Sequence, residues 1–362
     1  MLFESFRLDG IHLENRIVMA PMTRSRSTNN TPGPLVVQYY EQRATAGLII
    51  TEGTSPSPNG LGYARIPGLY SEEQVQAWRL VTDAVHKGGG KIFVQLMHAG
   101  RVGHQANLPA GARVIGPSLE ACPGEMWTDK DGLQPHTAPV AMTESDIAQA
   151  IAEYATAAKL AIKAGFDGIE LHAANGYLIE QFLNPNINKR SDAYGGSADA
   201  RNRFTLEVAQ ACVTAIGADK VGIRISPYGV FNGTGAFDIV EAQFLALTKK
   251  MSDMGLVYLH LVDHSAMGAP PVPPEFKQEL RASFARTFIA VGGFDAKSAE
   301  KVLKANEADL IAFGRPFISN PDLVARMKSG AALAVPEMST FYTPGEKGYT
   351  DYPSLVTNSV QA

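Results

Sequence analysis

A histidine, an asparagine and a tyrosine follow one apolar segment closely enough to act on a single oxygen atom. His172 ends the segment 168–172, and Asn175 and Tyr177 come directly after it. Histidine and asparagine side chains can both donate hydrogen bonds to one oxygen, and a tyrosine, with a reference pKa of about 10, can supply a proton near neutral pH. These groups suit an oxyanion that forms as a carbonyl is reduced. An alternative stays open, in which His172 and Asn175 bond to loop backbone and Tyr177 packs beneath a helix.

Two glycine-containing turns could bind a phosphate group. Gly292 and Gly293 follow the apolar run 288–292, and Gly314 and Arg315 follow the run 310–314. Backbone N–H groups at such turns, with the guanidinium of Arg315, are suitable donors to a phosphate. The other interpretation is that the glycines only make tight turns and that Arg315 pairs on the surface.

Other chemistries fit the sequence poorly. His98 and His172 have no third residue at a convincing ligand spacing, so we expect no metal site. Ser226 lacks the G-x-S-x-G pattern, and the neighbouring residues 263–265 need not converge, which argues against a hydrolase triad. Glu170 should face the barrel interior rather than act in catalysis. No apolar run ends in a lysine that could form a Schiff base.

The elements that must position these residues are short apolar runs that alternate with helical patterns. This alternation is typical of α/β proteins with a parallel sheet. Eight such strands close into a (β/α)8 TIM barrel, whose active sites lie at the carboxyl ends of the strands. The predicted strands are 16–20, 48–52, 91–96, 168–172, 221–226, 258–262, 288–292 and 310–314.

The helices between the strands are predicted from apolar residues at helical spacing. One begins at Thr143, with Ser145 and Asp146 as capping candidates, and ends at Gly165. Another carries Val75, Trp78, Val81 and Val85 before Gly88. Further helices are predicted at about 34–46, 199–216, 237–254, 274–284, 295–305 and 319–329.

Two segments lie outside the alternating pattern. Residues 101–142, which are rich in glycine and proline, are too long for an ordinary loop, and we expect a capping excursion with a hairpin over the barrel mouth. Residues 6–13 should form a hairpin that closes the opposite end. We therefore predict a single domain over residues 1–362.

Composition narrows the possible partners and location. The 362 residues carry 32 Lys and Arg against 36 Asp and Glu, so the formal charge of −4 gives no basis for nucleic-acid binding. No apolar stretch is long enough to span a membrane, and the first residues are unlike a signal peptide. With only 2 cysteines, Cys122 and Cys212, we expect a reduced cytoplasmic protein, monomeric or homodimeric.

Several longer motifs match one family. The chain resembles the old yellow enzyme family from about residue 2 to 355, in the subgroup that carries Thr23 where another has cysteine. The resemblance implies FMN as a tightly bound, non-covalent cofactor and NADPH or NADH as reductant. The matching segments are 15–24, 95–101, 170–178, 181–183, 190–196, 202–204, 313–315 and 348–353.

The resemblance also implies a role for individual residues. His172 and Asn175 would bind the substrate oxygen, and Tyr177 would protonate the α-carbon. Tyr63 and Tyr349 would be further substrate-binding residues. The flavin would be bound by Pro21, Met22, Thr23, Gly53, Gln95, Arg224, Gly292, Gly293, Gly314 and Arg315.

The implied activity is that of an ene-reductase acting on enones, maleimides or nitroalkenes. Two alternatives stay open: reduction of nitrate esters or nitroaromatics at the same site, and a non-catalytic flavin-binding protein. The larger iron–sulfur dienoyl-CoA reductases are excluded, because 2 cysteines cannot ligate their cluster.

Overall fold

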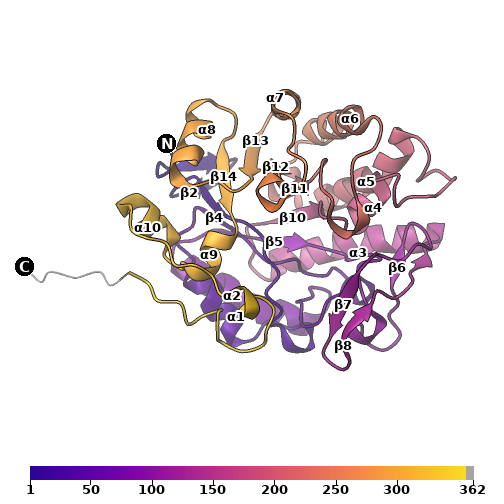
Figure 1. The fold of residues 1–362 in the computed structure, drawn as a ribbon, viewed down its shortest axis with the longest axis horizontal. Helices are drawn as coiled ribbons and strands as arrows, with labels where there is room; N and C mark the ends of the chain where they lie inside the picture. The colour runs from indigo at the N-terminus through magenta and orange to yellow at the C-terminus, as the bar shows by residue number, and fades with distance from the viewer. Residues whose placement is uncertain (356–362) are drawn as a thin grey trace, which may run out of the picture.

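The computed structural model describes residues 1–355, and its centre is a closed barrel of eight parallel strands (Figure 1). Each strand overlaps one of the predicted apolar runs, which confirms the (β/α)8 barrel. Strand β3 closes the barrel by pairing with both β4 and β14. In barrel order the strands are β3 (Ile17–Met19), β4 (Leu48–Ile50), β5 (Ile92–Leu96), β10 (Gly168–Ala173), β11 (Val221–Ile225), β12 (Tyr258–Val262), β13 (Thr287–Val291) and β14 (Leu310–Phe313).

Helices surround the barrel because each strand is followed by a segment with one apolar face. Seven strands are buried along their whole length, and the eighth, β13, over its first three residues, as expected for a sheet covered on both faces. The helices are α1 (Pro34–Glu41), α2 (Glu72–Lys87), α3 (Glu144–Lys163), α4 (Leu178–Leu183), α5 (Ala198–Ile216), α6 (Val240–Asp253), α7 (Pro274–Ser283), α8 (Ala296–Lys304), α9 (Arg315–Ser319) and α10 (Leu323–Ser329). None of these, within residues 1–355, is long and apolar enough to cross a membrane.

Two helix predictions need correction. The predicted helix 319–329 begins later, because Asn320 precedes a proline and has non-helical backbone angles, so α9 ends at Ser319 and α10 begins at Leu323. The cap of α3 is Thr143 rather than Ser145. Its hydroxyl accepts the amide proton of Asp146 (3.1 Å), whose carboxylate in turn accepts the Thr143 amide proton (2.8 Å).

The predicted hairpins are present at both ends of the barrel. At the amino-terminal end, β1 (Phe6–Leu8) pairs with β2 (Ile11–Leu13), and Leu8 and Leu13 pack into the apolar core of the barrel floor. At the other end, the excursion 101–142 contains the hairpin of β7 (Glu125–Thr128) and β8 (Gly132–Pro135), beside the paired β6 (Ile115–Gly116) and β9 (Val140–Ala141).

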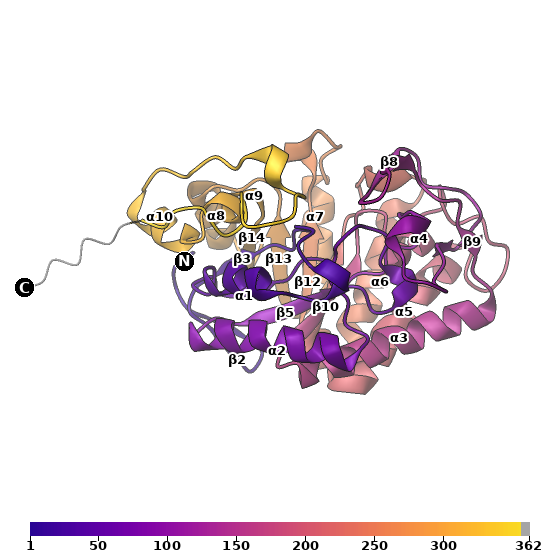
Figure 2. The same ribbon diagram turned by 90° about the horizontal axis from the view of Figure 1, so that it is seen from below.

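Figure 2 shows that the β7–β8 hairpin and the C-terminal segment both lie above the barrel, on the side away from β2. The barrel floor is thus filled by apolar side chains, and its mouth is covered by loops. Any site built on the strand ends lies between these loops and the barrel.

Candidate active site

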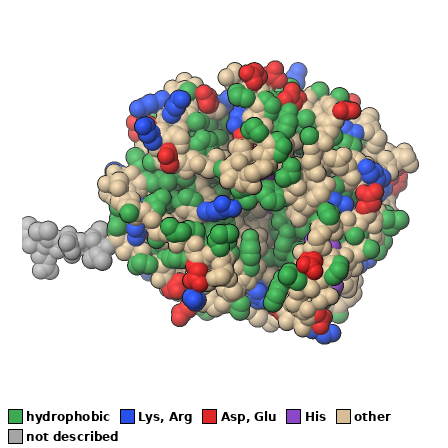
Figure 3. All heavy atoms as spheres, viewed as in Figure 1, with side chains coloured by type: hydrophobic (Ala, Val, Ile, Leu, Met, Phe, Trp, Pro, Cys, Tyr) green, Lys and Arg blue, Asp and Glu red, His purple; other side chains and the backbone are tan. Residues whose placement is uncertain are grey.

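The carboxyl ends of the strands open into two adjoining cavities of about 780 and 690 Å³. Figure 3 shows that this face of the molecule is hollowed near its centre. The β7–β8 hairpin lines the larger cavity, and the glycine turns after β13 and β14 line the smaller one. The two cavities share the residues Pro21, Thr23, Tyr63, Asn175, Tyr177, Arg224 and Tyr342.

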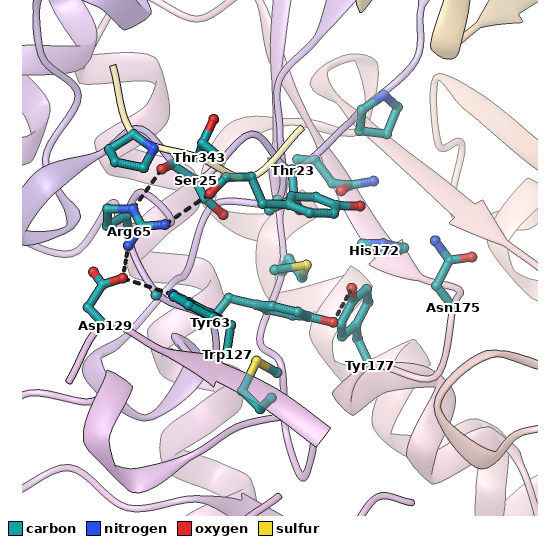
Figure 4. Close-up of a pocket in the computed structure, with 18 of the residues that line it drawn as sticks. Thr23, Ser25, Tyr63, Arg65, Trp127, Asp129, His172, Asn175, Tyr177 and Thr343 are labelled. Atoms are coloured by element: carbon teal, nitrogen blue, oxygen red, sulfur yellow. Dashed lines mark hydrogen bonds and ion pairs between the residues drawn. The ribbon is translucent and has the colours of Figure 1, made fainter. Parts of the chain in front are cut away.

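His172, Asn175 and Tyr177 all lie on the wall of the larger cavity (Figure 4). His172 is on β10, and the two others are on the turn between β10 and α4. The rings of His172 and Tyr177 meet edge to face, with their centroids 4.9 Å apart. The side-chain oxygen of Asn175 and Nδ1 of His172 have no hydrogen-bond partner among the described residues. Their polar atoms are therefore available to a ligand.

Burial fixes the protonation state of this group. It lowers the pKa of His172 well below 6.5, and the nearby charge of Arg224 lowers it further. Burial raises the pKa of Tyr177 to about 12, although a hydrogen bond from Tyr63 opposes the shift. The hydroxyls of Tyr63 and Tyr177 are 3.0 Å apart. At neutral pH the site thus holds a neutral imidazole and a protonated phenol.

A buried carboxyl group holds the turn that carries Asn175. Glu180 accepts the amide proton of Gly176 (2.6 Å) and the hydroxyl proton of Ser226 (3.1 Å). Ser226 in turn accepts the amide proton of Asn175 (2.9 Å). These bonds support a left-handed backbone at Asn175, with φ of 61°. The sequence analysis missed Glu180, although an acidic residue in the mostly apolar segment 178–183 was a usable signal.

Gln95 and Arg224 enter the site from the barrel interior. The side-chain amide of Gln95 donates to Glu170 (2.8 Å), whose other oxygen is 2.8 Å from Nδ1 of His260. Glu170 is completely buried inside the barrel, as expected. Because Gln95 uses its amide N–H in this bond, its carbonyl oxygen remains for a ligand.

The residues predicted to bind the cofactor all line one or both cavities. Pro21, Thr23 and Arg224 line both cavities, and Gly53 and Gln95 line the larger one. The Nε atom of Arg224 is buried without a partner in the described part of the chain, so it can donate to a bound group. A Cβ atom at Gly53 would lie 2.4 Å from Sδ of Met97, so this strand end has no room for a side chain. The smaller cavity is also lined by Met22, Gly292, Gly293, Gly314 and Arg315.

Tyr349 is not a substrate-binding residue, and this prediction was wrong. Its ring is fully buried outside both cavities and stacks on Tyr39 with centroids 4.1 Å apart. The guanidinium of Arg24 lies 5.2 Å from the same ring and donates to the carbonyl of Gly348 (2.7 Å). The C-terminal segment is thereby fixed to the barrel, and Tyr349 serves packing.

Two further results concern residues considered for other chemistry. Among residues 1–355, no group of three or more His, Cys, Asp and Glu side chains is placed to hold a metal ion. Cys122 and Cys212 are both buried and free.

The sequence analysis also missed Arg65, Asp129 and Trp127, which line the larger cavity. No pattern in the sequence distinguished them from ordinary loop residues.

Comparisons with known proteins identify the family of the chain. The model of the NADH:flavin oxidoreductase / NADH oxidase family matches residues 1–334. The chain is 40% identical to 12-oxophytodienoate reductase 7 of Oryza sativa, covering 98% of this chain and 94% of the relative. It is 39% identical to a probable flavin mononucleotide-dependent alkene reductase of Leishmania infantum, with 98% of each covered.

A solved structure of morphinone reductase in complex with tetrahydroNAD is 41% identical and superposes with a TM-score of 0.94, covering 100% of this chain and 99% of that chain. The matching relatives are oxidoreductases, so the chain is an enzyme rather than a flavin store. From the family match and the site together, the chain is an FMN-dependent NAD(P)H oxidoreductase that belongs to the old yellow enzyme family.

Proposed function

We propose that the enzyme reduces small activated alkenes, such as enones, maleimides and nitroalkenes. His172 and Asn175 bind the activating oxygen, and Tyr177 donates a proton to the α-carbon. The observation that carries this proposal is the convergence of these three side chains on one cavity wall, where Nδ1 of His172 and the side-chain oxygen of Asn175 have no partner among the described residues. The names of relatives, which include an alkene reductase and a 12-oxophytodienoate reductase, support the same class of substrate.

FMN held by residues such as Thr23, Gln95 and Arg224, once reduced by NADPH or NADH, would supply hydride to the β-carbon of the alkene. The residues of the chain then stabilise the charge that this transfer creates. Negative charge develops on the substrate oxygen, and hydrogen bonds from His172 and Asn175 offset it; one such donor is typically worth about 3–4 kcal/mol. The neutral imidazole of His172 donates a hydrogen bond without placing a second positive charge beside Arg224. This agrees with the lowered pKa of His172.

Tyr177 is suited to the proton transfer because it keeps its proton at every physiological pH, since its pKa is about 12. The Tyr63 hydroxyl, 3.0 Å away, can donate to the phenolate as it forms. Tyr63 thus orients the proton donor, and we propose that it also contacts substrate, because both tyrosines line the larger cavity.

The test is Tyr177→Phe, measured separately in the two half-reactions under anaerobic conditions. The variant should reduce its flavin with NADPH at the wild-type rate. Reoxidation by an enone should slow by roughly 100-fold or more, because a general acid is missing. Tyr349→Phe is the matched control, since it removes a buried tyrosine hydroxyl outside the cavities, and it should leave both rates unchanged. Equal loss of both half-reactions in Tyr177→Phe would contradict the assigned role.

A further inference from the structure

Arg65 joins three distant segments at the rim of the larger cavity. Its Nε atom donates to the carbonyl of Ser25 (3.0 Å), and Nη2 donates to the carbonyl of Tyr342 (2.9 Å). Its Nη1 atom forms an ion pair with Asp129 in the turn of the β7–β8 hairpin. Figure 4 shows Arg65 between Ser25 and Asp129. We name Ser25, Arg65, Asp129 and Tyr342 the Arg65 clasp, and all four line the cavity.

Contacts with three segments hold the Arg65 side chain in one position. The side chain is only 15% exposed, and each of its three nitrogen atoms donates to a different segment. Its backbone is left-handed, with φ of 56°, a conformation that is unfavourable for a residue with a long side chain. The carbonyl of Arg65 accepts the amide proton of Ser27 (2.9 Å), which helps to hold this conformation.

The Arg65 clasp positions an apolar wall of the larger cavity, which Trp127 and Leu133 of the β7–β8 hairpin form; we name it the hairpin wall. The indole of Trp127 donates to the same carboxylate oxygen of Asp129 (3.1 Å), and Asn107 donates to the Trp127 carbonyl (2.8 Å). Trp127 and Leu133 are 52% and 57% exposed, and both line the larger cavity. A two-stranded hairpin is only marginally stable by itself, so the position of this wall depends on its contacts with the rest of the protein.

We propose that Arg65 is a positioning residue for substrate specificity. It fixes the hairpin wall, and that wall binds apolar parts of a substrate that extend away from the reacting alkene. This inference rests on the proposed function. A small cyclic enone needs His172 and Asn175, whereas an enone with an aryl extension also contacts the wall. Contacts far from the reacting carbon bind ground state and transition state alike, so their loss raises KM and leaves kcat unchanged.

The test compares cyclohexenone with benzylideneacetone in the FMN-loaded Arg65→Gln variant at saturating NADPH. The KM for benzylideneacetone should rise roughly three- to tenfold with kcat unchanged, a change of the size expected for the net contribution of one ordinary hydrogen bond. The KM for cyclohexenone should change by less than about twofold. An equal change for both substrates, or no change for either, would overturn the proposal.

A second variant and a direct measurement distinguish loss of the Arg65 clasp from misfolding of the Arg65→Gln variant. Asp129→Asn removes the ion pair and keeps the bonds of Arg65 to both carbonyls, so it should give a smaller change in the same direction. Hydrogen exchange of residues 125–135 should be faster in Arg65→Gln than in wild type, while exchange of the barrel strands is unchanged. Unchanged exchange in the hairpin would count against the clasp.

The matched control is Arg203→Gln, which breaks an exposed pair with Glu207 (2.7 Å) on α5. It should change neither KM nor hairpin exchange. Failure of the proposed function would look different: wild-type enzyme would turn over neither enone, whereas failure of this inference leaves wild-type turnover intact. The exchange measurement tests the clasp in either case.

Discussion

At the scale of single residues, burial shifts the pKa values of His172 and Tyr177 in opposite directions. Burial lowers the pKa of His172 because the charged form of histidine is the protonated imidazole. It raises the pKa of Tyr177 to about 12 because the charged form of tyrosine is the deprotonated phenolate. Neither group changes its protonation state near neutral pH. A single physical cause therefore keeps His172 uncharged and Tyr177 protonated.

Tyr349 provides the first prediction at this scale. Its hydroxyl is buried and has no partner among residues 1–355, so Tyr349→Phe removes an unsatisfied polar group. We expect the free energy of unfolding in urea to stay within about 0.5 kcal/mol of wild type or to rise. Tyr349→Ala should cost about 3–5 kcal/mol, because it leaves a cavity beside Tyr39. A raised KM for alkenes in Tyr349→Phe would restore the substrate-binding role.

At the scale of elements, the site depends on strand ends and on short turns that buried polar groups hold. The turn after β10 is the main example, since Glu180 and Ser226 fix the backbone of Asn175 and Gly176. The supporting residues come from α4 and from the end of β11. Residues of two neighbouring βα units therefore hold Asn175 in its position.

The cap of α3 gives a prediction at the element scale. Thr143 and Asp146 bond to each other's backbone, and Ser145 makes no such bond. Thr143→Ala should lower the free energy of unfolding by about 1 kcal/mol, and kcat/KM should be unchanged. Ser145→Ala is the control and should change neither quantity. A larger loss in Ser145→Ala than in Thr143→Ala would show that the cap is assigned to the wrong residue.

The barrel elements were predictable because local patterns encode them. Apolar runs such as residues 310–313 indicate buried strands in an α/β alternation, and the helical stripes between such runs specify the outer layer. The residues at the strand ends followed from the same pattern. Arg65 could not be found this way, because its partners Asp129 and Tyr342 are brought together only by the folded chain. Tyr349 was misplaced for the same reason: its burial depends on Arg24 and Tyr39.

At the scale of the whole molecule, two buried carboxyl groups should make stability depend on pH. Burial raises the pKa of Glu52 to about 7 and that of Glu180 to about 8, from 4.5. Between the unfolded and folded pKa values each of these two carboxyl groups binds more protons in the folded protein, so their contribution to stability should fall as pH rises from about 4.5 to about 8. The buried histidines His98, His172 and His264, whose pKa values burial lowers from 6.5, act in the opposite direction.

Urea unfolding of the FMN-loaded enzyme at pH values of about 5.5 and 8.5 measures this effect. Glu180→Gln should shift the change in stability between these two pH values in favour of pH 8.5, because one of the two carboxyl groups no longer titrates. Glu207→Gln, which changes a partly exposed carboxylate on α5, should leave the pH dependence as it is in wild type. An identical pH dependence in Glu180→Gln and wild type would contradict the assignment.

The pairing of β3 with β14 has a consequence for how the protein is made. Ile17 is among the first barrel residues to leave the ribosome, yet its partner Ile311 is among the last. Arg24, which follows that first strand, likewise makes its contacts with Gly348 and Tyr349 only after those two residues have been made. During synthesis the first strand of the barrel therefore has an unpaired edge until β14 has been made. The barrel can close, and the cavities at its mouth can form, only after both partners of this pair have left the ribosome.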